Sequence, residues 1–144
     1  METKPIGIAV RCLNNRIGRA ISSSAAREFG DSATAVHGWV VRYLYDHRDQ
    51  NVYQRDLETR FSVRRSTMTS ILKLMEKNGL IARESDKNDG RLKKLILTPL
   101  AIDIQERMRK EIDIIEAQMC QGLTKEELAA FVATAEKIGQ NLTT

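Results

Sequence analysis

Several residue types are scarce in this chain of 144 residues, and each scarcity excludes a class of protein. Only two prolines and eight glycines are present, which argues against collagen-like or long disordered segments. No run approaches the roughly 18 apolar residues of a membrane span. The short apolar run at 6–10 ends at Arg11 and is too short for a signal-peptide core. We therefore expect a cytoplasmic protein that does not bind membranes.

Cysteine is equally scarce, because Cys12 and Cys120 are the only two and lie far apart in the sequence. Neither belongs to a C-x-x-C pair, and the two histidines do not cluster with them, so we expect no metal site. The sequence also lacks a Gly-rich phosphate loop, an H-E-x-x-H motif and a Ser or Cys nucleophile elbow. We therefore expect neither an enzyme activity nor a cofactor.

Positive charge is present and is concentrated in one segment. The formal net charge is +4, and the segment 55–94 contains eleven Lys and Arg against six Asp and Glu, a local net charge of +5. Such a concentration is typical of a face that binds nucleic acid, although acidic partners or solvent also suit it.

Apolar residues recur at spacings of three and four, the helical period, in most of the chain. Thr98-Pro99 and the capping box Thr124–Glu127 predict two helix starts, and Gly30, Asn78-Gly79 and Gly122 predict helix ends. The predicted helices span about 5–29, 34–47, 54–61, 65–78, 99–121 and 125–142.

The pattern between residues 54 and 97 predicts a winged helix-turn-helix. Two short helices joined only by residues 62–64 are typical of a helix-turn-helix unit. After Gly79, short apolar segments at 80–83 and 94–97 flank the turn-forming run 86–90, which predicts a β-hairpin. The expected fold class is mainly α with a small β-hairpin wing.

The terminal helices predict a homodimer. A helix of 22 residues is about 33 Å long, and a core of this size cannot cover its whole apolar stripe. We expect the helices at about 5–29 and 99–142 to form the dimer base, the alternative being that they pack only on each other.

The second helix of a helix-turn-helix enters the major groove of double-stranded DNA, and its N-terminal side chains contact the bases. Arg64 stands at the N-cap, where a cation opposes the helix dipole unless a phosphate neutralises it. The alternative is a solvated charged face. The predicted DNA-binding residues are Arg64, Arg65, Ser66, Thr67, Thr69, Ser70 and Lys73 on this helix, and Lys87, Asp89, Arg91 and Lys93 on the wing.

These motifs resemble the MarR (multiple antibiotic resistance regulator) family over nearly the whole chain. The resemblance implies a single domain over residues 1–144, with the winged helix-turn-helix at about 34–98. It also implies a triangular homodimer that represses a pseudo-palindromic operator, with Arg91 in the minor groove and Asp89 positioning it. The matching runs are 54–58, 65–69, 74–81, 89–91 and 97–98.

Three residues depart from the family pattern. Arg64 replaces the usual small cap, Tyr53 replaces a common threonine, and Ala101 stands where glycine is common. These departures bear on the details of sequence recognition rather than on the fold.

The resemblance also implies an effector, for which the sequence leaves alternatives open. A small aromatic ligand between base and lobe would involve Arg16, His37, Trp39 and Tyr43, although these residues more simply pack the junction. Cys12 lies near the reactive cysteine of the organic-hydroperoxide sensors in the family, and Cys120 would be its resolving partner across subunits. Reactive thiols of this kind need a lowered pKa and some exposure, and the simpler interpretation is two packed thiols.

A helical protein-interaction module remains the other class of function. It would explain the long helices but not the basic segment or the hydroxyl-rich helix. DNA binding should weaken steeply as salt rises, whereas an apolar helix–groove interaction should not.

Overall fold

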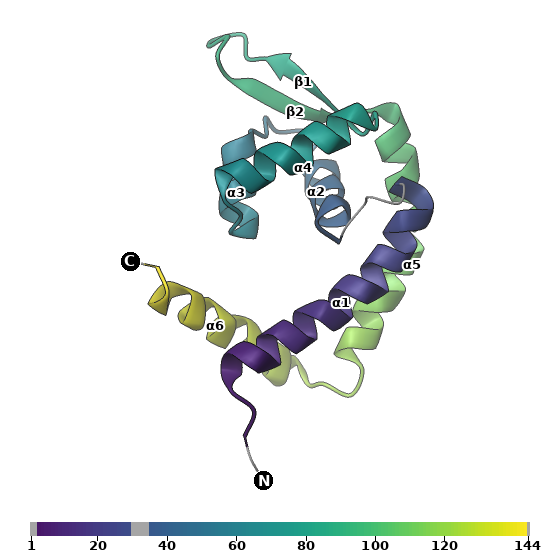
Figure 1. Cartoon of the computed structure of the whole chain (residues 1–144). Helices are drawn as coiled ribbons and strands as arrows, with labels where there is room; N and C mark the ends of the chain where they lie inside the picture. Colours follow the sequence, from purple (N-terminus) through teal and green to yellow (C-terminus); the bar gives the residue numbers. More distant parts are fainter. Residues whose placement is uncertain (1–2, 30–34, 144) are drawn as a thin grey trace. The chain divides into compact units, whose positions relative to one another are not determined.

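The computed structural model of the chain describes residues 3–29 and 35–143. The described residues form helices and one antiparallel hairpin (Figure 1), which confirms the predicted fold class. No helix among them is long and apolar enough to cross a membrane. The elements are α1 (Ile6–Phe29), α2 (Ala35–Asp46), α3 (Gln54–Phe61), α4 (Arg65–Lys77), β1 (Ile81–Ser85), β2 (Lys93–Leu97), α5 (Pro99–Cys120) and α6 (Lys125–Asn141).

The chain divides into two compact units, Met1–Lys110 and Glu111–Thr144. The first contains α1 to α4, the hairpin and the first half of α5. The second contains the rest of α5 and α6. The winged helix-turn-helix therefore lies entirely within the first unit.

The core of the first unit is built from α2, α3, α4, the hairpin and the start of α5. In α4 the spacing of three and four buries Met68, Leu72 and Met75, whereas Ile71 is half-buried. The largest fully buried side chains also include Val40, Val41, Leu57, Leu80 and Met108. Burial of this kind contributes about 1.5–3 kcal/mol for each large side chain and fixes the orientation of α4.

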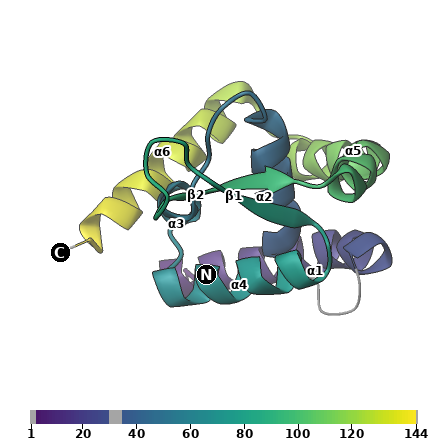
Figure 2. The same cartoon turned by 90° about the horizontal axis from the view of Figure 1, so that it is seen from above.

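The hairpin pairs Ile81 with Leu97 and Ser85 with Lys93, so both strands reach further toward the tip than the apolar segments predicted. Leu95 and Leu97 are buried, in the alternation expected of a strand with one covered face. The β2 strand contacts α2, and Figure 2 shows the hairpin crossing over that helix. The Leu95 N–H also donates to the Val52 carbonyl at 2.7 Å, a strand-like contact that the sequence pattern did not indicate.

The helix ends follow their capping residues. Gly79 and Gly122 have φ of +74° and +77°, the left-handed conformation that favours glycine. The Thr98 hydroxyl accepts the Ala101 N–H at 3.2 Å, as an N-cap does. Thr124 and Glu127 form the predicted capping box. The predicted end at Gly30 lies outside the described residues.

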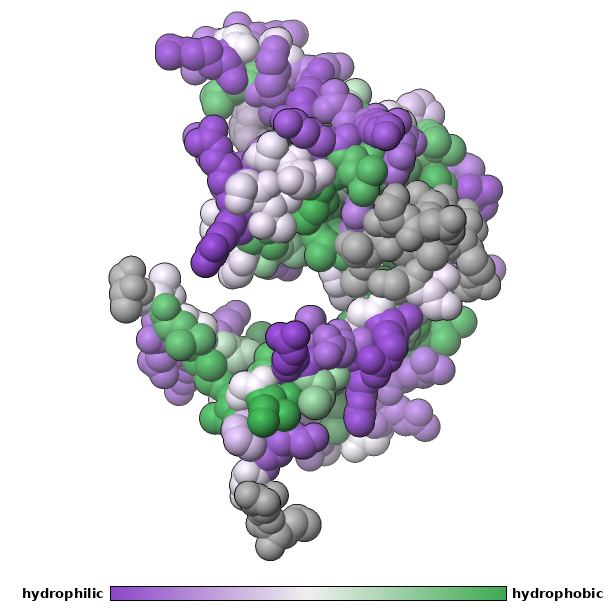
Figure 3. All heavy atoms as spheres, viewed as in Figure 1, coloured by the Kyte–Doolittle hydropathy of each residue, from purple (hydrophilic) through white to green (hydrophobic). Residues whose placement is uncertain are grey.

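Two sets of apolar side chains remain exposed. In the first unit they comprise Ile6, Ile8, Val10 and Leu13 along the N-terminal half of α1, and Leu100 at the start of α5. In the second unit none of the α6 side chains, all of which the structure describes, is buried. Figure 3 shows hydrophobic residues on the surface of α6. The exposed apolar side chains of this unit are Ile114, Met119, Leu123, Phe131, Val132 and Leu142.

Candidate nucleic-acid interface

A groove of about 340 Å³ lies between the start of α3, the first turns of α4 and the wing. Figure 3 shows hydrophilic residues gathered over the hairpin end of the first unit. The groove is lined by Tyr53, Gln54, Arg55, Glu58, Arg65, Thr69, Arg83, Arg91, Leu92 and Lys93.

The lining of this groove is strongly basic. It contains five cationic side chains and a single carboxylate, that of Glu58. The Arg83 guanidinium also pairs with Glu76, 3.1 Å from Nε to Oε2, at the edge of α4. Five cations around one concave surface create a positive potential that attracts an anionic chain such as a nucleic-acid backbone.

The residues predicted on α4 all lie on its accessible side. Arg64, Arg65, Ser66, Thr67, Ser70 and Lys73 are exposed, and Thr69 is half-exposed. Of these, Arg65 and Thr69 line the groove. The face opposite to the buried methionines is therefore the polar face that the periodicity predicted.

Two hydroxyls on this face are bonded within the protein. The Thr69 hydroxyl donates to the Arg65 carbonyl at 2.8 Å and accepts from Gln54 Nε2 at 2.9 Å. The Ser70 hydroxyl donates to the Ser66 carbonyl at 3.2 Å. Their protons point into the helix backbone, so either hydroxyl would meet a ligand as an acceptor or after rotation about χ1.

The N-terminus of α4 differs from that of α6. Arg64 occupies the N-cap and its side chain makes no cap hydrogen bond within the described residues, and the first turn carries no acidic residue. In α6, by contrast, Thr124 caps the helix and Glu126 and Glu127 occupy the first turn. The positive end of the α4 dipole is thus available to an external anion.

The wing tip is held by carboxylates. Asp86 Oδ1 accepts the Asn88 N–H at 2.8 Å, and Asp89 Oδ1 accepts the Arg91 N–H at 3.0 Å. Asp89 Oδ1 also lies 3.7 Å from Arg91 Nε.

The basic side chains of the wing differ in their contacts. The Arg91 side chain is 96% exposed and extends from the tip, whereas Lys93 donates to Ser85 Oγ at 2.7 Å. The remaining predicted wing residue, Lys87, is exposed.

Tyr53 joins the wing to α3. Its hydroxyl donates to Asp86 Oδ2, and the Arg55 guanidinium lies 5.5 Å from the centre of its ring. The hydrogen bond to Asp86 is the largest cause of a raised Tyr53 pKa, and the same bond lowers the pKa of Asp86.

The groove contains residues that the sequence had not placed at the site, namely Tyr53, Gln54, Arg55, Glu58, Arg83 and Leu92. The basic segment already included Arg55 and Arg83, so local charge was the one available signal for them. The role of Tyr53 depends on a partner 33 residues away, which no local pattern indicates.

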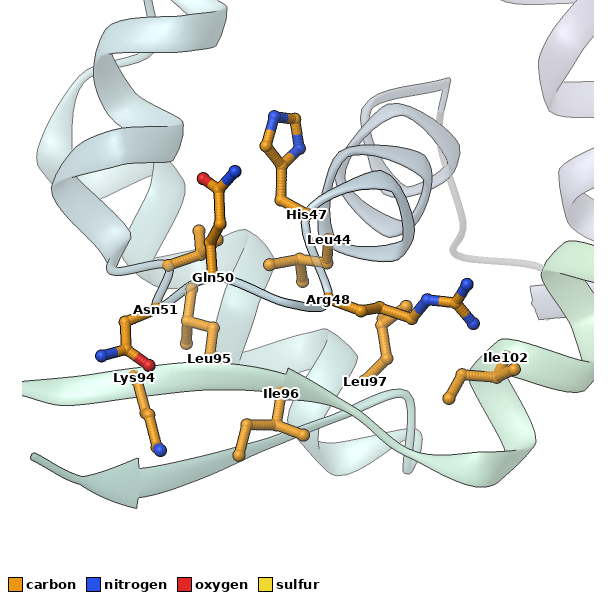
Figure 4. Close-up of a pocket in the computed structure, with 11 residues that line it drawn as sticks. Leu44, His47, Arg48, Gln50, Asn51, Lys94, Leu95, Ile96, Leu97 and Ile102 are labelled. Atoms are coloured by element: carbon orange, nitrogen blue, oxygen red, sulfur yellow. The ribbon is translucent and has the colours of Figure 1, made fainter.

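A second hollow of about 250 Å³ lies between the end of α2, β2 and the start of α5. Figure 4 shows Leu95 and Leu97 pointing from β2 toward Leu44, with Lys94 and Ile96 on the other side of the strand. His47 lines the hollow and donates from Nδ1 to the Tyr43 carbonyl at 2.7 Å.

The four residues predicted to bind an aromatic effector line neither the groove nor this hollow. Arg16 is exposed on α1, Trp39 is half-buried, and the half-buried Tyr43 ring stacks on His47 at 4.0 Å. His37 is buried, and burial lowers its pKa. An effector site formed by these four residues remains a prediction.

The two cysteines are free thiols, each half-buried, with Cys12 in α1 of the first unit and Cys120 at the end of α5 in the second. Their redox pairing remains a prediction. Within residues 3–29 and 35–143, no group of three or more His, Cys, Asp and Glu is arranged to hold a metal ion.

Comparison with known proteins places this architecture among transcription regulators. A model of the MarR family matches residues 34–93, which include α2, α3, α4 and β1. The S. aureus MepR–DNA complex is similar with a TM-score of 0.84 at 22% identity, covering 97% of this chain and 100% of that chain. This likeness concerns the fold.

Two further structures each have 27% sequence identity to the chain. One is the transcription regulator MarR from Oenococcus oeni PSU-1, with a TM-score of 0.74 and coverage of 94% of this chain and 96% of that chain. The other is the heme sensor protein PefR from Streptococcus agalactiae in complex with heme, with a TM-score of 0.59 and coverage of 94% and 89%. The matched family model, the winged helix-turn-helix and these structures agree: residues 34–93 match the MarR family, and the described fold is similar to that of MarR-family transcription regulators.

Proposed function

We propose that the protein is a homodimeric repressor that binds a pseudo-palindromic operator in double-stranded DNA. In this proposal α4 enters the major groove with Arg64, Arg65, Ser66 and Thr67 nearest the bases, and Arg91 reaches the adjacent minor groove. Asp89 holds the Arg91 backbone during that contact. The protein acts in the cytoplasm, where bacterial chromosomal DNA lies, and has no catalytic role.

The basic groove is the observation that carries this proposal. Five cations line it beside a single carboxylate, directly against the polar face of α4. Each cation that neutralises a phosphate releases condensed counterions, so this face favours DNA and makes binding strongly dependent on salt. The uncapped N-terminus of α4 adds a second favourable position for a phosphate. An apolar partner helix would gain nothing from either feature.

The test is fluorescence anisotropy of labelled genomic duplex DNA over a salt series, followed by selection of the tightest duplex. Wild-type protein should bind with a steep negative slope against the logarithm of the salt concentration. Arg91→Ala should weaken binding by roughly tenfold and reduce the salt slope by about one.

Arg42→Ala is the matched control for the loss of one positive charge. Arg42 lies on α2, pairs with Asp46 at 3.9 Å, and does not line the groove. This variant should bind as the wild type does. Absence of binding at low salt, or equal losses for the two variants, would contradict the proposal and favour a helical protein-interaction module.

The exposed apolar side chains support the dimeric part of the proposal. All but Leu100 lie either on α1, near one end of the chain, or from the second half of α5 to the C-terminus, near the other. We assign them to a second copy of the chain because a two-fold protein matches the two-fold symmetry of a palindromic operator.

A small aromatic effector that lowers operator affinity completes the proposal. The heme complex of the relative PefR supports the view that proteins of this fold accommodate an effector. Trp39 is the only tryptophan in the chain and is half-buried on α2. Benzoate, used as a probe, should therefore change its fluorescence and weaken DNA binding together. If neither changes, benzoate is not an effector, and if only the fluorescence changes, binding and release are not coupled.

A further inference from the structure

The hydrogen bond between Tyr53 and Asp86 spans the gap between the helix-turn-helix and the wing. Tyr53 is the N-cap residue of α3, and Asp86 follows the last residue of β1 at the wing tip. At the base of the wing, the Leu95 N–H donates to the Val52 carbonyl at 2.7 Å. Two adjacent residues therefore hold the wing: Val52 bonds to its base, and Tyr53 bonds to it near its tip.

Both partners in the Tyr53–Asp86 bond are held in place. The Tyr53 N–H donates to Asp56 Oδ2 at 2.8 Å, which fixes the backbone at the start of α3. The Arg55 guanidinium lies over the Tyr53 ring, 5.5 Å from its centre. Asp86 uses its other oxygen to accept the Asn88 N–H, so its carboxylate has little freedom to rotate.

A continuous series of hydrogen bonds leads from this point to Arg91. The Asp86 N–H donates to the Leu92 carbonyl at 2.9 Å, and the Leu92 N–H donates to the Asp89 carbonyl at 3.0 Å. Asp89 then accepts the Arg91 N–H. The Arg91 side chain is 96% exposed, so it is not held by packing. The backbone of the loop therefore determines the position from which this side chain extends.

From this geometry we propose that Tyr53 is a positioning residue for DNA binding. Its hydroxyl braces the wing tip against α3 and so fixes Arg91 relative to α4. The inference rests on the proposed DNA binding and adds to it a residue outside the expected contacts. A braced wing loses less conformational freedom when it docks, because the tip already has its bound orientation.

Tyr53→Phe removes only the hydroxyl and keeps the ring under Arg55. It should weaken operator binding by about fivefold, a loss in keeping with one partly exposed hydrogen bond to a carboxylate. In an Arg91→Ala background the same change should have little further effect, because Tyr53 acts through Arg91. A role in general stability would instead weaken binding equally in both backgrounds.

Tyr45→Phe is the matched control, because Tyr45 reproduces the same chemistry away from the groove. Its hydroxyl donates to Glu106 Oε1 at 3.3 Å, and the Arg48 guanidinium lies 3.8 Å from its ring centre. Neither Tyr45 nor Glu106 lines the groove. Tyr45→Phe should leave DNA affinity unchanged.

Hydrogen exchange of residues 86–92 separates failure of the brace from failure of the proposed function. Tyr53→Phe should accelerate exchange at the Leu92 N–H in protein without DNA, and Tyr45→Phe should not. Unchanged exchange, unchanged affinity in Tyr53→Phe, or equal losses in both Arg91 backgrounds would overturn the brace while leaving DNA binding intact. If wild-type protein binds no duplex at low salt, the proposed function fails, and with it the role of the brace in positioning Arg91.

Discussion

His37 is an ionisable side chain whose surroundings oppose its charged form. The residue is 3% exposed at the start of α2, and burial lowers its pKa below the ordinary value of 6.5. The unfolded chain therefore binds a proton at His37 at a higher pH than the folded chain does. Stability rises with pH wherever the unfolded state binds more protons, so His37 makes stability fall as pH drops below about 6.5.

We predict that His37→Gln reduces this pH dependence. Urea unfolding at about pH 7.5 and pH 5.5, at one protein concentration, gives the free energy of unfolding for both proteins. The wild type should lose stability on acidification, and the variant should lose less because its residue 37 does not titrate. The test is the change in unfolding free energy between the two pH values. The absolute stability of the variant is not informative, because repacking around residue 37 can lower it by itself. Equal losses in the two proteins would refute the prediction.

The contrast between Arg91 and Tyr53 explains which site residues the sequence could predict. Arg91 was assigned to the site because it directly follows a turn-forming run between two apolar segments, which is a local pattern. The part played by Tyr53 depends on Asp86, 33 residues away, and on the twist of a hairpin that no pattern specifies. Thr69 was predicted as a contact, but its hydroxyl is already bonded to Gln54 and Arg65, which only the packing of α3 against α4 determines.

The junction between α4 and the wing depends on the backbone conformation of one glycine. Gly79 has φ of +74°, and a Cβ built on it would lie 4.0 Å from Leu100 Cδ2, an ordinary contact. Gly79→Ala should therefore destabilise the fold through backbone strain alone, by about 1 kcal/mol. Thermal and urea unfolding measure this difference.

Gly38→Ala is the control for the added methyl group. Gly38 lies inside α2 with ordinary φ, and a Cβ there would lie 3.8 Å from Ile21 Cγ2. Because alanine favours a helix interior, this variant should be neutral or more stable by up to about 1 kcal/mol. If both variants lose the same stability, the left-handed conformation is not the cause of the loss at Gly79.

Helix positions were predictable because periodicity and capping are local properties. The bounds of α3, Gln54–Phe61, agree with the predicted range, and α4 ends one residue before its predicted end at Asn78. The strands extended further than expected because charged and hydroxyl residues near the tip, such as Glu84 and Lys93, carry no apolar signal. Their pairing depends instead on the register set by Ile81 and Leu97.

The exposed apolar face of α6 bears on the assembly of the whole molecule. Phe131 is 58% exposed, and none of the α6 side chains is buried. A helix in this state gains little stability within its own chain, because tertiary burial of an apolar face supplies most helical stability in proteins. The proposed second copy of the chain would provide that burial.

Phe131→Asp should therefore convert the proposed dimer into monomers, because it places a charge in the proposed interface. On an exposed monomer surface the same change would cost less than about 0.5 kcal/mol, so a large effect identifies association. Sedimentation equilibrium measures the mass, and anisotropy on the selected duplex should show at least about tenfold weaker binding, since the two DNA-binding lobes are no longer joined. Ala133→Asp, two residues and about 200° further around the helix, should remain dimeric and bind normally. A dimeric Phe131→Asp protein would exclude this face from the interface, and a monomeric variant with full affinity would show that one copy suffices for the DNA contact.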